Sequence, residues 1–369
     1  MSAPLLSLSR RLRRTPFSAR VEAAGVKGYT VYNHMLLPTV FDTPEADYRH
    51  LKTHVQVWDV ACERQVEITG PDAFRLTQML TPRSLANIEY GRCLYTPMVD
   101  ETGGMLNDPV TLKLDEDRYW VSIADSDLLL WVKGLACGLG LEVEVFEPDV
   151  SPLGVQGPKS DDLMARVFGE EVRNIGFFRF DRMAFGAHAF IVARSGYSKQ
   201  GGFEIYLEGR ENGEALWDAL FAVGEDLNVR AGGPNAIERI EGGLLSYGND
   251  MTREDTPFEC GLGKFAQPGE AVGCIGREAL LRQAADGPRR QIRGVRIEGG
   301  PVPLCTQAWP VMVDGQRVGQ VTSAMWSPDF ETNVAIGMID ASHWTPGTPV
   351  EVETPDGTRS GVIAALPYT

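Results

Sequence analysis

The sequence contains no long hydrophobic run and has a shortage of basic residues. No apolar stretch reaches the roughly 18 residues that a membrane-spanning helix requires. The 35 Lys and Arg residues are outnumbered by 50 Asp and Glu residues, which gives a formal net charge of −15. Because sequence-independent nucleic-acid binding needs a basic face that displaces phosphate counterions, we expect no nucleic-acid partner, and we expect no membrane partner. A local basic pocket for an anionic small molecule remains compatible with this charge.

Cysteine is scarce and widely spaced. The six cysteines are residues 62, 93, 137, 260, 274 and 305, with no CxxC pair and no dense cluster. This spacing supports neither a zinc finger nor a disulfide scaffold, and it is typical of a protein in a reducing compartment.

Several catalytic and metal-binding motifs are also missing. The chain has no GxxxxGK[ST] phosphate loop, no GxSxG nucleophile elbow and no HExxH motif, which disfavours a nucleotide hydrolase and a serine hydrolase. The glycine cluster "GLACGLGLEV" is predicted at a helix end and does not follow a strand, so it does not fit a dinucleotide site. His50 and His54 are four residues apart in a predicted helix. Two histidines alone make an incomplete metal site, and we expect them on a solvated helix face.

The N-terminal segment "MSAPLLSLSRRLRRTPFSARVEAAG" is rich in Arg and Ser and has no acidic residue before Glu22. This composition is typical of a mitochondrial transit peptide. A basic arm packed on the folded body is the alternative. We favour the arm, because the segment lacks a clear apolar face and leads directly into sequence with the pattern of folded structure. We therefore expect a cytoplasmic protein.

Two parts of the chain repeat the same order of predicted elements. "VEITGPDAFRLTQML" (66–80) and "LGVQGPKSDDLMARVF" (153–168) each predict a strand, a Gly-Pro turn and an amphipathic helix. A strand, a polar turn, a second strand and a helix are predicted after each of them. We expect two related α+β units, at about residues 1–150 and 151–285, which together form a region of residues 1–285.

The remaining part, residues 286–369, has a different pattern. Segments such as "WPVMVDGQRVGQVTSAM" and "TPVEVETPDGTRSGVIAAL" alternate apolar and polar residues around Asp-Gly turns. This alternation predicts an all-β terminal domain, a small barrel or a jelly roll. The expected fold class is therefore α+β with a C-terminal β domain.

The tripeptide Asn107-Asp108-Pro109 interrupts a strand whose flanks alternate cleanly. Proline cannot donate to a strand ladder, so it predicts either a bulge or an edge strand. Bulges re-aim side chains and are common beside active sites. A plain edge strand with an exposed Asp108 is the alternative, and this stretch alone does not decide between the two.

A second candidate lies in the hairpin "ARSGYSKQGGFEIYL". Period-two alternation predicts that Glu204 and Tyr206 share one face of a strand, while Phe203 and Ile205 face the core. A carboxylate beside a phenol suits an amide-rich heterocycle, because the carboxylate can accept hydrogen bonds from ring N–H groups. A solvent-exposed strand face is the alternative.

The densest acidic run places Asp250, Glu254, Asp255 and Glu259 within ten residues. The run lacks the D-x-[DN]-x-[DN]-G spacing of a calcium loop, so we do not expect a metal cage. We expect "SYGNDM" to close a helix, with left-handed residues at the glycine and asparagine, and the acidic residues to cap the following turns.

The motifs "GGMLNDP", "RSGYSKQGGFEIY", "ERIEGGLLSYGNDM", "TPFECGLGKF", "CIGREAL" and "GQVTSAMWSP" occur in this order over nearly the whole chain. Together they resemble the folate-dependent aminomethyltransferase family, to which the glycine cleavage T-protein belongs. The resemblance implies three domains arranged as a clover-leaf around a central folate channel, with the β domain last. It also implies tetrahydrofolate as the methyl-accepting cosubstrate, and no metal.

The resemblance implies roles for particular residues. Asp108 matches the aspartate beside folate N5 and is the expected catalytic residue. The expected folate-binding residues are Glu204, which matches the carboxylate that holds the pterin ring, and Tyr206, Tyr197, Tyr95 and Ser122. On chemical grounds, and not from the resemblance, Tyr32, Trp120 and Phe178 are the expected substrate-binding residues, because an aromatic face attracts a cationic substrate. One position departs from the family pattern, because T-proteins carry a folate-contacting arginine where this chain has Asn235.

Within that family, "RRLRRTPFSARVEAAGV", "YTVYNHM" and "GRCLYTPMVDETGG" resemble a branch of demethylases with a sulfonium methyl donor. This match includes the N-terminal arm, which favours the arm over a transit peptide. It implies a tetrahydrofolate-dependent methyltransferase with a small-molecule sulfonium substrate, and it leaves a homodimer open. Aminomethyl transfer from a lipoyl carrier, another folate-dependent demethylation and non-catalytic folate binding are the alternatives.

Overall fold

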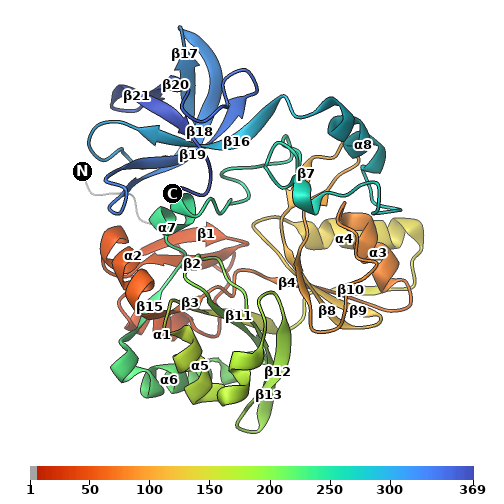
Figure 1. The fold of residues 1–369 in the computed structure, drawn as a ribbon. Coiled ribbons are helices and arrows are strands. Elements are labelled where there is room, and N and C mark those ends of the chain that lie inside the picture. The colour runs from red at the N-terminus through yellow and green to blue at the C-terminus, as the bar shows by residue number, and fades with distance from the viewer. Residues whose placement is uncertain (1–5) are drawn as a thin grey trace. The chain divides into compact units, whose positions relative to one another are not determined.

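The computed structural model describes residues 6–369, which form two compact units (Figure 1). Unit 1 contains the residues up to 64, residues 149–196 and residues 200–234. Unit 2 contains residues 65–148, 197–199 and 235–369. The chain therefore passes between the two units several times, and each unit is described by itself.

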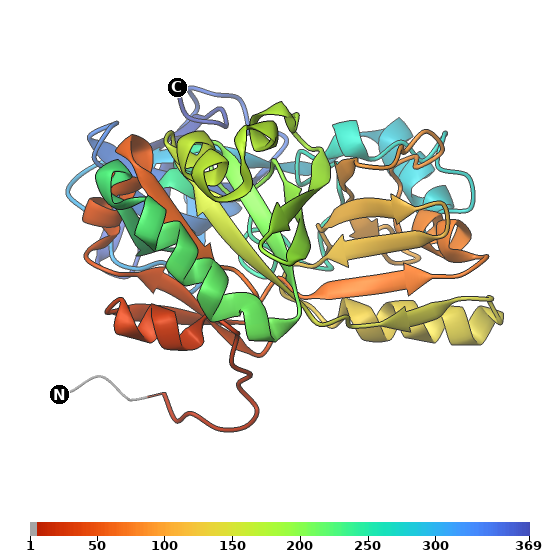
Figure 2. The ribbon, with the colours of Figure 1, turned by 90° about the horizontal axis from the view of Figure 1, so that it is seen from below.

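Unit 1 is built on a six-stranded sheet. In sheet order its strands are β12 (Phe180–Phe185), β13 (His188–Ala193), β14 (Gly202–Glu208), β11 (Val150–Gln156), β3 (Val55–Asp59) and β15 (Val229–Gly232). All neighbours are antiparallel except β15 and β3, which run parallel. Helices α5 (Ser160–Phe168) and α6 (Gly213–Val223) cover one face of this sheet (Figure 2).

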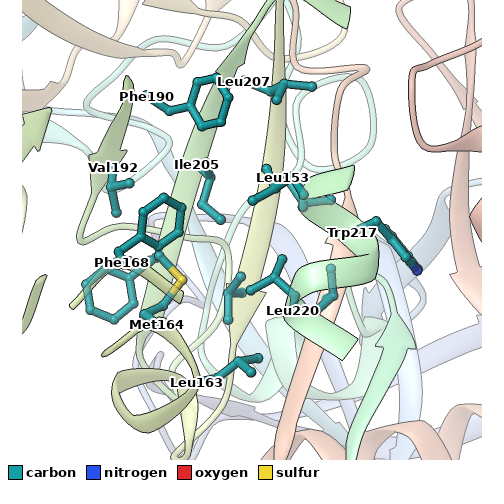
Figure 3. Packing of buried hydrophobic residues seen from close by; sticks show 14 of the residues in the cluster. Leu153, Leu163, Met164, Phe168, Phe190, Val192, Ile205, Leu207, Trp217 and Leu220 are labelled. Atoms are coloured by element: carbon teal, nitrogen blue, oxygen red, sulfur yellow. The ribbon is translucent and has the colours of Figure 1, made fainter. Parts of the chain in front are cut away.

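The core of unit 1 lies between those helices and the sheet. Ile205 and Leu207 of β14 are fully buried there with Leu163 of α5 and Leu220 of α6 (Figure 3). Phe203 of β14 belongs to the same buried cluster. Since side chains alternate across a strand, the residues between them in β14 lie on the opposite face. The predicted division of β14 into a core face and a second face is therefore confirmed.

The N-terminal part of unit 1 packs on its sheet. It comprises α1 (Ser18–Ala23), the hairpin of β1 (Gly28–Tyr32) and β2 (Met35–Val40), and α2 (Pro44–Thr53). The Thr15 hydroxyl donates to Asp59 Oδ2 over 2.6 Å, and Phe17 is fully buried in the unit 1 core. From Thr15 onward the N-terminal segment is thus part of the folded body, as expected for an arm. Residues 1–5 of that segment lie outside the described part of the chain.

The prediction of a solvated helix face for the two histidines of α2 is wrong for one of them. His50 is 6% exposed and its Nε2 lies 2.9 Å from the Asn228 carbonyl oxygen. Burial lowers its pKa to about 4, so the ring is neutral at pH 7. The His54 ring stacks on it, with ring centroids 5.0 Å apart. The pair is thus a packing feature. Helix periodicity alone does not reveal that Asn228, just before β15, lies against this face.

Unit 2 begins with a five-stranded antiparallel sheet. Its strands in sheet order are β10 (Glu144–Phe146), β4 (Gln65–Thr69), β9 (Arg118–Ser122), β8 (Val110–Asp115) and β5 (Cys93–Tyr95). Helices α3 (Ala73–Leu80) and α4 (Leu128–Leu139) bury apolar residues against one face of it. The helix α4 ends at Gly140, whose φ of 60° is left-handed, and the glycine cluster is thus a helix end as predicted.

The C-terminal part of unit 2 is a closed six-stranded barrel. In order around the barrel the strands are β16 (Arg290–Ile297), β19 (Thr332–Asp340), β18 (Gln316–Ser327), β17 (Trp309–Val313), β20 (Pro349–Thr354) and β21 (Gly357–Ala364). Closure leaves no unpaired strand edge. The predicted α+β class with a C-terminal barrel is confirmed.

Shorter elements complete the two units. The remaining elements are β6 (Met98–Val99), β7 (Met105–Asn107), α7 (Ala236–Glu241), α8 (Arg277–Asp286), and the 3-10 helices η1 (Glu170–Asn174), η2 (Arg210–Asn212), η3 (Glu225–Leu227) and η4 (Gly263–Phe265). Within residues 6–369, no helix has the length and apolar character needed to cross a bilayer. The domain boundaries predicted at about residues 150 and 285 stay a prediction.

Candidate active site

The backbone around Asp108 changes its pairing partner. The preceding strand β7 pairs with β6, whereas the following strand β8 pairs with β5 and β9. Pro109 lies at the change, where its missing N–H costs no ladder bond, and its carbonyl oxygen accepts from Thr96 N over 2.9 Å. The predicted interruption is present, and it is a junction between two sheets, not an edge strand with an exposed carboxylate.

The two carboxylate oxygens of Asp108 have different surroundings. Oδ2 accepts a hydrogen bond from the Tyr95 hydroxyl over 2.8 Å. Oδ1 is inaccessible to solvent and accepts no hydrogen bond from the residues that the structure describes. A buried carboxylate oxygen without a donor is costly, so it indicates a place where a ligand can donate.

Burial raises the pKa of Asp108 to about 7. The Tyr95 hydrogen bond acts against this rise, and the negative charge of Asp250 adds to it. Asp108 can therefore exchange a proton near neutral pH, which suits a general base. Burial and the neighbouring Asp108 raise the pKa of Tyr95, so the Tyr95 hydroxyl keeps its proton and remains the donor.

One row of side chains crosses the unit 2 sheet next to Asp108. Tyr95 lies directly opposite Val110, Val110 opposite Ser122, and Ser122 opposite Gln65. Directly opposite residues share a face, and this is the face away from α3 and α4. The Ser122 hydroxyl accepts from Gln65 Nε2 over 2.9 Å. The structure thus brings together Asp108, Tyr95 and Ser122, three of the residues predicted from sequence.

Trp120 belongs to the next row on the same face. It has no exposed surface, and its Nε1 donates to Glu67 Oε2 over 2.8 Å. Arg118 Nε completes the cluster by donating to Glu67 Oε1 over 2.6 Å. Trp120 therefore lies near the Asp108 face as part of a closed network, and its predicted contact with substrate stays a prediction.

Three residues that sequence reasoning did not select lie near this site. Phe265 and Arg83 contact Tyr95, while burial and the nearby Asp108 raise the pKa of Tyr247. The Phe265 ring meets the Tyr95 ring edge-on, with centroids 5.1 Å apart. Arg83 places its guanidinium 5.0 Å from the centre of the Phe265 ring and donates from Nη1 to the Tyr95 carbonyl oxygen over 2.7 Å. The Tyr247 hydroxyl donates to the Met105 carbonyl oxygen in β7 over 2.9 Å. The available signal was the family motif "TPFECGLGKF", which ends in Phe265.

Tyr197, another predicted residue, belongs to unit 2 and lies beside a buried ion pair. Its hydroxyl donates to the Leu245 carbonyl oxygen over 2.7 Å. Arg239 Nη1 lies 2.8 Å from Asp250 Oδ2, and the Asp250 side chain has no exposed surface. Asp250 acts on the pKa of both Asp108 and Tyr197, which shows that the ion pair belongs to the same electrostatic environment.

The acidic run beyond Asp250 is structural. Asp255 and Glu259 each form an ion pair with Arg290 over 3.0 Å, and each also accepts from a backbone N–H at the start of a turn. Turn capping by Asp255 is therefore confirmed. The predicted helix closure at "SYGNDM" is wrong: helix α7 already ends at Glu241, because the chain turns there at Gly242 and Gly243.

Unit 1 carries the second predicted carboxylate. Glu204 is 7% exposed, accepts a hydrogen bond from the Ser195 hydroxyl at Oε2, and lies opposite Gly154 of β11. Burial raises the pKa of Glu204, and the Ser195 hydrogen bond acts against this rise. Gly154 in turn lies opposite Trp58 of β3. Glu204, Gly154 and Trp58 therefore form a row across three strands, in which the Trp58 side chain packs over the small Gly154.

The other predicted residues of unit 1 are not part of that row. Tyr206 lies on the same face as Glu204 but is 1% exposed. Tyr32 packs against a cluster that contains Trp58 and Leu37. Phe178 has a left-handed backbone with φ of 55°, and its ring meets the exposed Phe177 edge-on. Their predicted roles stay predictions.

Asn235 occupies the position at which T-proteins carry an arginine. It is 4% exposed and is the N-cap of α7, where its Oδ1 accepts from the backbone N–H groups of Ile237 and Glu238. The side chain is therefore used locally to start a helix. It supplies no positive charge at this position.

The two sheets with their covering helices and the C-terminal barrel define the fold, and the sequence comparisons show the family to which it belongs. Residues 17–269 match the GCVT N-terminal domain, and residues 290–368 match the Glycine cleavage T-protein C-terminal barrel domain. The chain belongs to the glycine cleavage T-protein family.

Among its relatives is dimethylsulfoniopropionate demethylase DmdA of Ruegeria pomeroyi, which is 66% identical over 351 residues, or 95% of this chain and 96% of the relative. An aminomethyltransferase of Caldanaerobacter subterraneus is 28% identical over 86% of this chain and 85% of the relative. The crystal structure of glycine cleavage system aminomethyltransferase T from Bartonella henselae superposes with a TM-score of 0.86 at 24% identity, covering 97% of this chain and 98% of that chain. This last similarity establishes the fold.

Proposed function

We propose that this protein transfers a methyl group from dimethylsulfoniopropionate to N5 of tetrahydrofolate, giving 5-methyltetrahydrofolate and 3-(methylthio)propanoate. The observation that carries the proposal is the 66% identity, over nearly the full length of both chains, to a protein named dimethylsulfoniopropionate demethylase. Membership of a family of folate-dependent transferases supports the cosubstrate. Asn235 supports a reaction other than aminomethyl transfer, because the T-protein arginine is missing there.

Asp108 and Glu204 each have surroundings that suit a contact with folate. In unit 2, the buried Asp108 Oδ1 has no donor, and a protonated ring nitrogen could supply one. In unit 1, the Glu204 carboxylate lies beside the small Gly154, and a carboxylate is the acceptor that the N–H groups of a pterin ring require. We therefore propose that Asp108 contacts N5 of the folate and that Glu204 accepts hydrogen bonds from other N–H groups of the pterin ring.

Tetrahydrofolate, when bound, supplies N5 as the nucleophile that takes the methyl group, while the carbon–sulfur bonding pair returns to sulfur and leaves a neutral thioether. Positive charge moves from sulfur toward nitrogen in this step. A fixed Asp108 carboxylate stabilises the arriving charge and then accepts the nitrogen proton. Tyr95 holds that carboxylate in place through its 2.8 Å hydrogen bond. Alignment of the reacting atoms supplies the rest, and such positioning is worth about 7–11 kcal/mol.

The sulfonium donor requires an aromatic surface. A cation on an aromatic face gains about 0.5–2 kcal/mol. Tyr95 and Phe265 provide two such rings beside Asp108, and neither ring is fully buried. The sequence-based candidates Tyr32, Trp120 and Phe178 remain proposals, and Trp120 would need to expose its ring to serve.

The direct test is incubation of the purified protein with tetrahydrofolate and separate methyl donors under anaerobic conditions. Mass spectrometry should detect 5-methyltetrahydrofolate and 3-(methylthio)propanoate in equal amounts with dimethylsulfoniopropionate. An aromatic methyl ether tests for an O-demethylase, and a lipoyl carrier protein tests for aminomethyl transfer. Methylenetetrahydrofolate that forms only with the lipoyl carrier would reject the proposal, and folate binding without turnover would indicate a binding protein.

A cytoplasmic location, no metal, no nucleic-acid partner and a homodimer as one option stay predictions that belong to this proposal. Within residues 6–369, no three His, Cys, Asp or Glu side chains are grouped to hold a metal ion. Metal analysis of the active preparation, fractionation of the source cells and light scattering of the purified protein test them.

A further inference from the structure

Arg83 is a half-buried cation without an acidic partner. Among residues 6–369, no carboxylate lies within ion-pair distance of its guanidinium, although acidic residues outnumber basic ones by fifteen in this chain. Within the described part of the chain, the guanidinium donates from Nη1 to the Tyr95 carbonyl oxygen, and its Nη2 and Nε have no acceptor. A half-buried guanidinium with unused donors is suited to bind an external anion.

The Arg83 side chain is held by groups that also form the Asp108 site. Its guanidinium lies over Phe265, the ring that meets Tyr95 edge-on, and Tyr95 in turn donates to Asp108. The Lys264 ammonium also lies 4.8 Å from the Phe265 ring centre. Arg92 is close enough to lower the pKa of Arg83, after the larger effect of burial. These cations form a local basic patch within an acidic protein.

The backbone around Arg83 is fixed before any ligand binds. Gln78, at the end of α3, donates from Nε2 to the Arg83 carbonyl oxygen over 3.0 Å and accepts from Leu85 N over 2.8 Å. The Thr81 hydroxyl accepts from Arg83 N over 3.1 Å, and the Pro82 carbonyl oxygen accepts from Gln267 N over 2.8 Å. The last bond ties this turn to the segment that carries Phe265. Such fixed geometry reduces the entropy that is lost on binding.

We propose that Arg83 binds a carboxylate of a small molecule at the Asp108 site, either the carboxylate of the sulfonium donor or the glutamyl carboxylate of tetrahydrofolate. This inference rests on the proposed function for the identity of the ligands. Arg83 is a specificity-determining residue under this proposal, since a planar guanidinium can engage both oxygens of a carboxylate. Sequence patterns alone do not reveal it, because "LTPRSL" matches no anion-binding motif.

The test compares Arg83→Met and Arg83→Lys with the wild-type protein. If the donor carboxylate is bound, Arg83→Met raises the KM of dimethylsulfoniopropionate about 10- to 100-fold and abolishes its advantage over its methyl ester. If the folate carboxylate is bound, Arg83→Met instead removes the preference for tetrahydrofolate over tetrahydropteroate, which lacks the glutamyl group. Arg83→Lys should lie between, because it keeps the charge but not the planar fork.

Arg293→Met is a matched control. Arg293 also lies 5.0 Å from an aromatic ring centre, that of Trp344, and donates to a backbone carbonyl oxygen, but it shares no recorded contact with Tyr95, Phe265 or Asp108. Its removal should leave both preferences unchanged. The proposal is overturned if Arg83→Met alters neither preference while circular dichroism shows a folded protein. If the wild type transfers no methyl group, the proposed function is wrong, but the role of Arg83 can still be tested. Calorimetry then compares the binding of dimethylsulfoniopropionate with its methyl ester, and of tetrahydrofolate with tetrahydropteroate.

Discussion

Two aspartates of unit 2 have the same side chain but different surroundings. Asp250 stabilises the fold, whereas Asp108 is placed to react with a ligand. Asp250 is fully buried and accepts from Arg239, Ser246 N and the hydroxyls of Thr322 and Ser323, so both of its oxygens are satisfied. Among residues 6–369, Tyr95 is the only side chain that donates to Asp108, and the second carboxylate oxygen is buried with no hydrogen-bond partner. A carboxylate whose two oxygens both accept hydrogen bonds stabilises the fold, whereas a carboxylate with an oxygen that accepts none can bind a ligand.

The densest acidic run is therefore not the chemical centre. Its members hold α7, the following turns and the barrel strand β16 through Arg239 and Arg290. The isolated Asp108, at a junction between two small sheets, has the shifted pKa and the unused oxygen. Local density of charge is a poor guide to function here, and completeness of hydrogen bonding is a better one.

The largest expected effect is on turnover by Asp108→Asn. The change keeps the shape but removes both the charge that stabilises N5 and the base that takes its proton. We expect kcat to fall about 100- to 10,000-fold. Steady-state assays of 5-methyltetrahydrofolate formation measure this, and a kcat within threefold of the wild type would remove Asp108 from the mechanism.

The same variant should be more stable than the wild type at high pH. In the wild type the Asp108 pKa rises from an ordinary 3.8 to about 7 on folding, so the unfolded chain releases this proton first as pH rises. The wild type therefore loses stability between about pH 4 and pH 7 relative to Asp108→Asn, and the difference is constant above pH 7. Melting temperatures across that range measure it. A difference that shrinks with rising pH would contradict burial as the cause.

Asp250→Ala should unfold the region that Asp250 holds together. It leaves the buried Arg239 without an acidic partner, and breaking a buried ion pair in this way costs about 3–5 kcal/mol of unfolding free energy. Urea titration followed by tryptophan fluorescence measures the loss. Asp226→Ala is the matched control, because Asp226 pairs with Arg166 on the surface and its removal should have little effect. Equal losses of unfolding free energy in the two variants would show that the buried ion pair contributes no more to stability than the exposed one.

Glu204→Gln should weaken folate binding. The amide can no longer accept charge-assisted hydrogen bonds from ring N–H groups, which predicts an increase in the tetrahydrofolate Kd of about 10- to 100-fold. Isothermal titration calorimetry measures this change. Glu208→Gln in the same strand is the control, because Glu208 forms a partly exposed ion pair with Arg182 over 2.9 Å. If both variants bind equally well, Glu204 does not hold the pterin.

The smallest effect is expected from Tyr95→Phe. The Tyr95 hydroxyl lowers the pKa of Asp108, so its removal should raise that pKa further above about 7. Because the ionised carboxylate is the active form, the rise of kcat/KM with pH should move to higher pH, with about a tenfold loss at pH 7. A pH–rate profile measures the shift. An unchanged pH–rate profile would show that the ionisation of Asp108 does not determine the pH dependence of kcat/KM.

Much of the local structure could be predicted from the sequence. Period-two alternation predicts β14 and the barrel strands, and period 3.6 predicts α3 and α5, since each pattern reports which side chains face a core. Pro109 predicts the interruption at Asp108, because a proline has no N–H to give to a ladder. The roles assigned to the site residues come from family resemblance and stay predictions.

Other features depend on contacts between segments far apart in the chain. His50 is buried where the distant Asn228, just before β15, returns against its helix, and no local pattern contains that information. Arg83, Phe265 and Tyr95 meet although they come from three segments, so their patch is invisible in the sequence. The early end of α7 follows from a turn at two glycines, which competes with continued helix.

The sequence by itself predicted most of the elements and a C-terminal β domain, because these follow from periodicity and turn residues, and the family resemblance added Asp108 and Glu204 as candidate carboxylates. Only the tertiary structure decided which carboxylate remained unsatisfied. Asp250 and Asp108 are the same residue type, and what separates them is the number of donors that folding brings within about 3 Å. That number depends on distant residues, which no local pattern specifies.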